Sequence, residues 1–200
     1  DHVGVHLCLC MMETDTIAEI WFETQDDITI LHNENGNELV EFVQVKNEDR
    51  TSRWSIKAVC QSKNGGTNCL VTKSLLNDRC LEPTRFRIVT SYDVMNELDV
   101  LKYPIGGQFR VTGKTKQDDL VTEIEKLIGK IKSPNGNGID YWASNCLWQK
   151  LPDSIPALEA QNKIQLEKVL KRFPQNIYPD QRDELYQHLL ALVKDASTVD

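Results

Sequence analysis

The sequence predicts an α/β protein, with an αβββαβ core over residues 1–92 and a helical extension over residues 93–200. Two β-rich runs flank an Asn-Gly dipeptide, which is the strongest short hairpin signal. Another β-rich run follows two helix-like segments, so we expect it to lie parallel to a neighbouring strand through a helical crossover. After about residue 92, apolar residues recur mainly at helical spacing. The length suits one domain with an appendage, or two small domains.

The core begins with a predicted amphipathic helix in which Val3, Leu7 and Met11 recur at helical spacing. The remaining core elements follow from alternating apolar residues, turn residues and the break at Pro83. In chain order, the predicted core consists of a helix over 3–15, strands over 16–23, 27–31 and 39–46, helices over 54–61 and 67–80, and a strand over 84–91. The hairpin turn is predicted over residues 33–37.

The extension is predicted to contain helices over 117–131, 139–150, 154–173 and 179–195. Ser154 can cap the third of these, and Pro156 sits in its first turn. Its apolar stripe, interrupted at Asn162, is Ile155, Leu158, Leu166, Val169 and Phe173. In the last helix we expect Leu185, Leu189, Leu190, Leu192 and Val193 to point inward.

Two interpretations of this extension stay open: a bundle that packs on the core or on a copy of itself, or a surface for a dimer partner or a sensor domain. The aromatic side chains of Tyr141, Trp142 and Trp148 are expected in the core, with stacking on bases as the alternative.

Composition limits the classes of function. The chain has 23 basic and 30 acidic residues, a formal net charge of −7, so a strongly basic whole-chain signature for nucleic acid is missing. Basic residues nevertheless cluster just after the hairpin, at Lys46, Arg50, Arg53, Lys57 and Lys63. There is no G-x-x-x-x-G-K-[ST] loop for nucleotide hydrolysis and no G-x-S-x-G element for acyl chemistry.

The cysteines and apolar runs indicate the compartment. Six cysteines without a C-x-x-C pair, and four scattered histidines, argue against a zinc site and fit the reducing cytosol, so we expect a cytoplasmic protein. No signal peptide and no apolar run long enough to span a membrane is found. The chain begins within a predicted helix, as expected of a segment cut from a longer protein.

Polar residues at the open end of the hairpin carry the predicted chemistry. Side chains alternate along a strand, so Gln44 and Lys46 share one face, and the hairpin brings them close to Asp26 and Asp27. Carboxylate and amide oxygens suit Mg²⁺. A lysine beside them can orient or help to deprotonate a metal-bound water and neutralise charge on a phosphate.

Each acidic residue near this site also has a plainer interpretation. Glu23 and Asp26 can be ordinary strand-end charges, and Asp27 can cap the turn with its side chain. Glu41 alternates away from Gln44 and Lys46, which places it on the far face or a rim although it resembles a motif acid. Glu13, at the end of the first helix, is a third option for completing the metal site beside Glu23 and Asp26, or is simply solvated.

The pattern resembles the PD-(D/E)xK nuclease superfamily, in the variant where Gln replaces the second acid. Glu23, Asp26-Asp27 and Gln44-Val45-Lys46 stand at the offsets of that motif. More narrowly, FETQDDITI followed by FVQVKN resembles the nuclease domain of bacterial anti-phage effectors. In CBASS defence such domains are fused to a SAVED-type cyclic-nucleotide sensor, and related ones work beside a HerA-like ATPase. The sharp similarity covers about residues 13–60.

The resemblance implies a restriction-endonuclease-like fold and a metal-dependent DNA endonuclease with little sequence specificity, activated by homo-oligomerisation. Asp27 and the Gln44 carbonyl would bind Mg²⁺, or Mn²⁺ in its place, with Glu23 or Asp26 as a further ligand, and Lys46 would activate the attacking water. Backbone phosphates of double-stranded DNA would be contacted by Arg50, Arg53 and Lys57.

Two other hypotheses stay open. A catalytically degenerate nuclease fold could serve only to bind nucleic acid or a partner, because Gln in place of an acid lowers the charge of the metal site. In the second of these hypotheses, the protein is a helical assembly module and its N-terminal sheet has only a structural role. The sequence leaves the choice between DNA and RNA, the cut pattern and the activating ligand undetermined.

Overall fold

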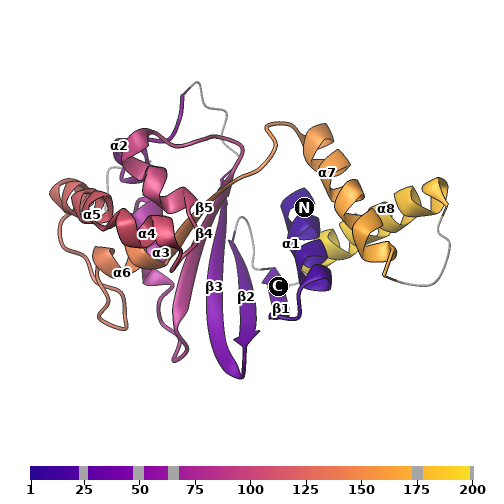
Figure 1. Ribbon diagram of the computed structural model, residues 1–200, viewed down its shortest axis with the longest axis horizontal. Coiled ribbons are helices and arrows are strands. Elements are labelled where there is room, and N and C mark those ends of the chain that lie inside the picture. The colour runs from indigo at the N-terminus through magenta and orange to yellow at the C-terminus, as the bar shows by residue number, and fades with distance from the viewer. Residues whose placement is uncertain (23–26, 47–51, 63–67, 173–177, 199–200) are drawn as a thin grey trace.

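The structure, a computed structural model, describes residues 1–22, 27–46, 52–62, 68–172 and 178–198 (Figure 1). Its elements are α1 (His2–Glu13), β1 (Ile17–Phe22), β2 (Asp27–Glu34), β3 (Asn37–Lys46), α2 (Ile56–Val59), α3 (Leu70–Leu76), β4 (Thr84–Thr90), the 3₁₀ helix η1 (Asn96–Lys102), α4 (Gln108–Thr112), α5 (Lys114–Ile128), α6 (Ile139–Asn145), β5 (Cys146–Lys150), α7 (Ile155–Leu170) and α8 (Pro179–Ala196). The predicted α/β class and the αβββαβ order are confirmed. No described helix is long and apolar enough to cross a membrane.

The sheet has the strand order β1-β2-β3-β4-β5. Its first three strands are antiparallel, whereas β4 lies parallel to β3 and β5 parallel to β4. The helix predicted over 139–150 is therefore wrong in its second half, because residues 146–150 form β5. Cys146 and Trp148 alternate with less buried neighbours and pair with Phe86 and Ile88 of β4. Five residues are too few for periodicity to separate a strand from a helix.

The β2–β3 hairpin turns at Asn35 and Gly36, a shorter turn than the predicted 33–37. Both residues have positive φ, 57° and 84°, as a two-residue type I′ turn requires. The Asn33 side chain accepts a hydrogen bond from the Gly36 amide at 2.9 Å. This turn sets the register that brings the two ends of the hairpin together.

Helices cover both faces of the sheet. Figure 1 shows α2–α6 on one side and α1, α7 and α8 on the other. The larger core lies under α2–α6, where Phe42, Phe86 and Ile88 of the sheet meet Leu98 and Trp142. It draws residues from both sides of position 92, so the segments before and after that position pack together. Trp142 and Trp148 are buried, as expected of core residues.

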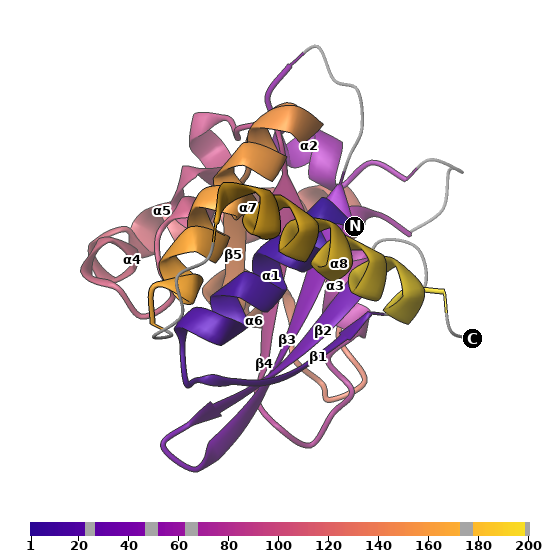
Figure 2. The same ribbon diagram turned by 90° about the vertical axis from the view of Figure 1, so that its right-hand side faces the viewer.

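The α1–α7–α8 layer faces the viewer in Figure 2. Ser154 caps α7 as predicted, its hydroxyl accepting from the Ala157 amide. Leu158, Leu166 and Val169 are buried as predicted, and the polar residue Asn162 is buried with them. Asn162 is inward because its Nδ2 donates to the His2 carbonyl at 2.9 Å.

Three predicted core positions of these helices are wrong. Ile155 is 61% exposed and Leu192 65% exposed, and Leu185 is also at the surface. The buried positions of α8 are Val193, as predicted, and Tyr186, which was not predicted; both pack against α1 and α7. Four leucines in a short run do not fix which face of a helix turns inward. Phe173 lies outside the described residues.

Gly4 allows α8 and β1 to approach α1 closely. A Cβ at this position would lie 2.6 Å from Val193 Cγ1 and 2.8 Å from Phe22 Cε1. We therefore expect Gly4→Ala to lower the free energy of unfolding by about 1–3 kcal/mol through overpacking, measured by urea denaturation.

The matched control for Gly4→Ala is a double-mutant cycle with Val193→Ala, which removes the nearer of the two contacting atoms. The double variant should be more stable than the sum of the single losses predicts. Strict additivity of the two losses would contradict this packing of α8 on α1.

Candidate active site

Three of the predicted site positions, Asp27, Gln44 and Lys46, lie at one edge of the sheet, where β2 begins and β3 ends. The register pairs Asp27 with Gln44, and Lys46 follows two positions later at the end of β3. The hairpin thus places these three positions next to one another, as the sequence predicts. Glu23, Asp26 and Arg50 lie outside the described residues.

Gln44 has an unusual environment for a glutamine. Its side chain is only 2% exposed, between Asp27 of β2 and Ile88 of β4 in the register. Its Oε1 atom is buried and has no hydrogen-bond partner in the described part of the chain. A buried acceptor without a partner costs about 1–3 kcal/mol. A hard cation such as Mg²⁺, which prefers oxygen ligands, would satisfy this atom.

Lys46 belongs to a row of residues across the same edge. The register aligns Lys46 with Thr90 of β4, and Thr90 with Lys150 of β5. Aligned residues of parallel strands face the same side, and this is the side of Gln44, Phe42 and the α2–α6 layer. Lys46 is half-buried and Lys150 exposed. Their backbones are two strand spacings, or roughly 10 Å, apart.

Sequence reasoning missed Lys150. The helix predicted over 139–150 would keep Lys150 away from the sheet. In the structure, β5 places Lys150 in the row with Lys46. The sequence has no clear strand signal here, because Leu147 between Cys146 and Trp148 is also apolar and interrupts the alternation.

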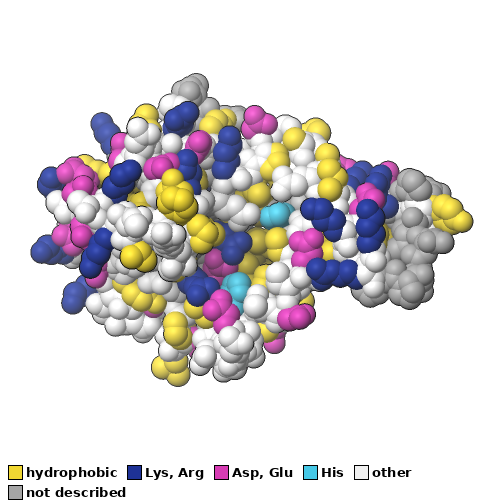
Figure 3. All heavy atoms as spheres, viewed as in Figure 1, with side chains coloured by type: hydrophobic (Ala, Val, Ile, Leu, Met, Phe, Trp, Pro, Cys, Tyr) yellow, Lys and Arg dark blue, Asp and Glu magenta, His cyan; other side chains and the backbone are white. Residues whose placement is uncertain are grey.

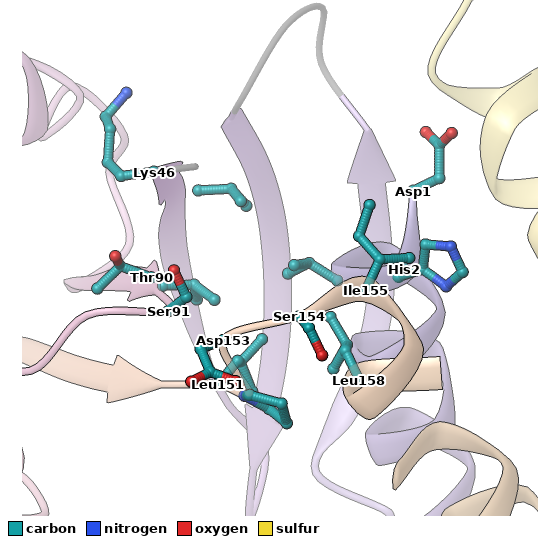
Figure 4. Close-up of a pocket in the computed structure, with 14 residues that line it drawn as sticks. Asp1, His2, Lys46, Thr90, Ser91, Leu151, Asp153, Ser154, Ile155 and Leu158 are labelled. Carbon is teal, nitrogen blue, oxygen red and sulfur yellow. The ribbon is translucent and has the colours of Figure 1, made fainter. Parts of the chain in front are cut away.

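A pocket of about 370 Å³ lies at the same edge but on the α1–α7 face. Its apolar lining includes Val45, Val89, Leu151 and Leu158, and Ser154 and Asp153 stand beside it. Figure 4 shows the Lys46 amine directed away from Leu151, Ser154 and the rest of the pocket. The pocket therefore lies mainly on the face opposite Gln44, although Lys46 and Thr90 of the Gln44 face also contribute to its lining.

Glu41 lies on that opposite face, as its alternation predicts, but it is buried rather than at a rim. Arg87 donates to both of its carboxylate oxygens, from Nε at 2.9 Å and from a terminal nitrogen at 2.7 Å. His32 Nε2 forms a third hydrogen bond at 2.9 Å. Burial alone would raise the pKa of Glu41, but these partners hold it below its ordinary value. Glu41 is thus an ion-pair residue, not the acid of the site.

The Glu41 cluster was not predictable from the sequence, since it depends on strand register. Arg87 also donates to Gln149 Oε1 at 3.2 Å, which extends the row of polar side chains from β2 to β5. In Figure 3 the molecular surface is hollowed between the two helical layers, and histidine, basic and acidic side chains gather there.

Glu13 is placed away from the site. It ends α1, whose first residues line the pocket beside Lys46. Twelve helical residues separate the two ends of α1 by roughly 17 Å. The Glu13 carboxylate accepts a hydrogen bond from Gln165 Nε2 at 2.9 Å. The option that Glu13 completes the metal site is therefore disfavoured.

Arg53 and Lys57, the described members of the predicted DNA contacts, are both exposed. They flank Trp54, whose ring packs edge-on against Trp148 of β5 with centroids 5.6 Å apart. This contact fixes the segment with Arg53 and Lys57 beside the strand that ends in Lys150. Three cationic residues therefore lie around the edge that holds Gln44 and Lys46.

The mixed sheet, the αβββαβ order and the hairpin-end site together define a restriction-endonuclease-like nuclease domain. The chain belongs to the family described as "Cap4, dsDNA endonuclease domain", whose model matches residues 1–197. The resemblance seen in the sequence is thereby confirmed. A search of curated proteins found no match.

Solved structures of Cap4 receptors share the fold. The Acinetobacter baumannii Cap4 SAVED/CARF-domain containing receptor with the cyclic trinucleotide 3'3'3'-cAAA matches with a TM-score of 0.62 and 11% identity, over 98% of this chain and 42% of that chain. The Moraxella osloensis Cap4 SAVED/CARF-domain containing receptor matches with a TM-score of 0.58 and 14% identity, over 98% and 41%. The present chain thus spans about two fifths of the length of these receptors.

Proposed function

We propose that the protein is a metal-dependent DNA endonuclease of bacterial anti-phage defence. The observation that carries this proposal is the buried, unpartnered Gln44 Oε1, opposite Asp27 and two positions before Lys46. Membership of the Cap4 endonuclease-domain family supports the same function. The product would be a cut phosphodiester backbone.

Asp27 and the Gln44 side-chain carbonyl would hold Mg²⁺ or Mn²⁺, with Glu23 or Asp26 as a further ligand. The bound ion would lower the pKa of a water and neutralise charge on the phosphate. Lys46 would orient this water or take up its proton, and its ammonium would stabilise charge that develops on the phosphate oxygens. Burial of Gln44 supports this arrangement, because a low-dielectric environment strengthens charge interactions.

Arg53, Lys57 and Lys150, together with Arg50, would contact backbone phosphates of double-stranded DNA. Such contacts carry no base information, so we expect little sequence preference and a strong dependence of binding on salt. The net charge of −7 makes a local cationic edge necessary, because the summed charge of this chain does not attract DNA.

For the whole protein we propose a nuclease segment joined to a SAVED-type sensor, with cleavage activated by homo-oligomerisation. The similar structures carry a SAVED/CARF domain and, in one case, a bound cyclic trinucleotide. A HerA-like ATPase as a separate partner is the other arrangement that the sequence resemblance implies.

Plasmid cleavage tests this proposal. We expect nicked and linear products from supercoiled DNA with Mg²⁺ or Mn²⁺, none with EDTA, and recovery when the ion is restored. The reason is that no described protein group satisfies Gln44 Oε1 in place of an ion. Cleavage that persists in EDTA would overturn the metal-dependent mechanism. DNA binding without Mn²⁺ binding by calorimetry would favour the degenerate, binding-only alternative.

A further inference from the structure

The pocket at the hairpin edge shares residues with the proposed nuclease site. Its lining includes Lys46 and Thr90, which lie in the row of residues on the Gln44 face. It also includes Val45 and Val89, whose side chains alternate to the opposite face of the same two strands. The pocket and the proposed site are therefore adjacent, and Lys46 belongs to both.

The side chain of Lys46 forms the boundary between the two. It lines the pocket, but its amine is directed away from it (Figure 4), so its alkyl stem is the part that borders the pocket. In nucleic acid a phosphate and a base are joined through a single sugar. A nucleotide whose phosphate contacts the Lys46 amine can therefore place its base on the other side of the stem, in the pocket.

The pocket has the size and the chemistry of a site for one flat, uncharged ring. Its volume of about 370 Å³ is near the lower end of the range for ligand sites. Val45, Val89, Leu151 and Leu158 provide aliphatic walls, and a base out of its stack packs well between apolar side chains. The Ser91 hydroxyl in the lining can donate or accept, so it suits the edge of any base.

Charge disfavours a phosphate as the occupant of this pocket. The carboxylates of Asp1, before α1, and of Asp153, before α7, are both part of the lining. Because the Lys46 amine is directed away, it does not compensate for them inside the pocket. A phosphate there would meet like charge, whereas a neutral base would not. The uncharged end of a nucleotide is thus the end that fits.

We propose that this pocket binds the base of one unstacked nucleotide of the DNA substrate, next to the phosphate that Lys46 contacts. This site depends on the proposed function, since the DNA phosphate at Lys46 comes from it. A base within a duplex must be unpaired and unstacked before it can enter a pocket, and the cost is lowest for a base that is already unpaired. The preferred substrate is therefore DNA that contains an unpaired nucleotide.

The fluorescence of 2-aminopurine tests this site. This base analogue is quenched while it is stacked in DNA, so a duplex with a single unpaired 2-aminopurine should brighten when the parent protein binds it. EDTA is present to prevent cleavage. The described lining residues other than His2 carry no aromatic ring that would quench the bound base again. A fully paired duplex of the same sequence should bind about tenfold more weakly, because its base must first be unstacked.

Two tryptophan variants of α7 separate the pocket from the rest of the surface. Ile155 lines the pocket and is 61% exposed, so Ile155→Trp can fill the pocket without disturbing the core. Ile164→Trp is the matched control, because Ile164 lies on the same helix, is 59% exposed and is outside the lining. Ile155→Trp should lose the preference for the unpaired base and keep the affinity for the paired duplex. Ile164→Trp should behave like the parent.

An unpaired 2-aminopurine that stays quenched on the parent protein, or an equal preference in the two variants, would overturn the proposed pocket. Loss of a dimer in Ile155→Trp alone, with its DNA preference unchanged, would assign the pocket to a second copy of the chain instead. Plasmid cleavage with Mg²⁺, measured on the same preparations, separates the two proposals. A parent that cleaves plasmid without the fluorescence change contradicts only the base pocket, whereas a parent that neither binds nor cleaves DNA contradicts the proposed function as well.

Discussion

Replacing Lys46 with alanine is expected to reduce plasmid cleavage by about 10²–10⁴-fold, the usual effect of losing a positioned proton-transfer group. Lys46 ends β3 on the face that carries Gln44, two positions beyond the proposed metal ligand. Its amine is directed away from the apolar pocket on the other face. Mn²⁺ binding and the free energy of unfolding should change little, because the oxygen ligands remain.

Two variants make the Lys46 result specific. Lys46→Arg keeps the charge but cannot give up a proton, so it should restore cleavage only if the lysine acts through its charge. Lys130→Ala, which removes an exposed lysine just after α5, should cleave like the parent. A Lys46→Ala protein as active as the parent would refute the proposed role of this residue.

Glu41→Gln is expected to have the largest effect on stability, lowering the free energy of unfolding by about 3–5 kcal/mol. The substitution keeps the shape of the side chain but leaves Arg87 without its buried carboxylate partner. Because Glu41 lies on the face opposite Gln44, the folded variant should keep Mn²⁺ binding. Chemical denaturation and calorimetry measure the two effects separately.

The stabilisation by Glu41 should depend on pH. Its pKa is lower in the folded protein than in the unfolded chain, so its contribution is complete above the unfolded value of about 4.3. This contribution to the free energy of unfolding is lost as the pH falls from the unfolded-state pKa through the lower pKa of Glu41 in the folded protein. The parent should therefore lose stability more steeply than Glu41→Gln below about pH 4.

Glu34→Gln is the matched control for Glu41→Gln. Glu34 pairs with Arg85 at 2.8 Å, a similar contact in which the two side chains are 43% and 29% exposed. Solvent screens such a pair, so we expect a loss below about 1 kcal/mol. Equal losses in the two variants would contradict the special importance of the buried cluster.

The hairpin and the site could be predicted because their signals are local. Asn35-Gly36 specifies the turn, the turn sets the register, and the register places Asp27 opposite Gln44. The order of the core elements follows in the same way from local periodicity.

What the sequence did not reveal depends on contacts between distant segments. β5 became recognisable only through its pairing with β4, and with it the position of Lys150. The ion pair of Glu41 with Arg87 likewise joins two strands through their register. In α8 the buried Tyr186 was missed because its place is fixed by α1 and α7, not by the leucines around it.

The most direct measurement is anomalous diffraction from crystals of the protein grown with Mn²⁺. The proposed mechanism predicts one ion bound by Gln44 Oε1 and the Asp27 carboxylate, with metal–oxygen distances of about 2.0–2.3 Å and the Lys46 amine beside a coordinated water. An ion bound elsewhere, with Gln44 Oε1 hydrogen-bonded to the protein instead, would contradict it.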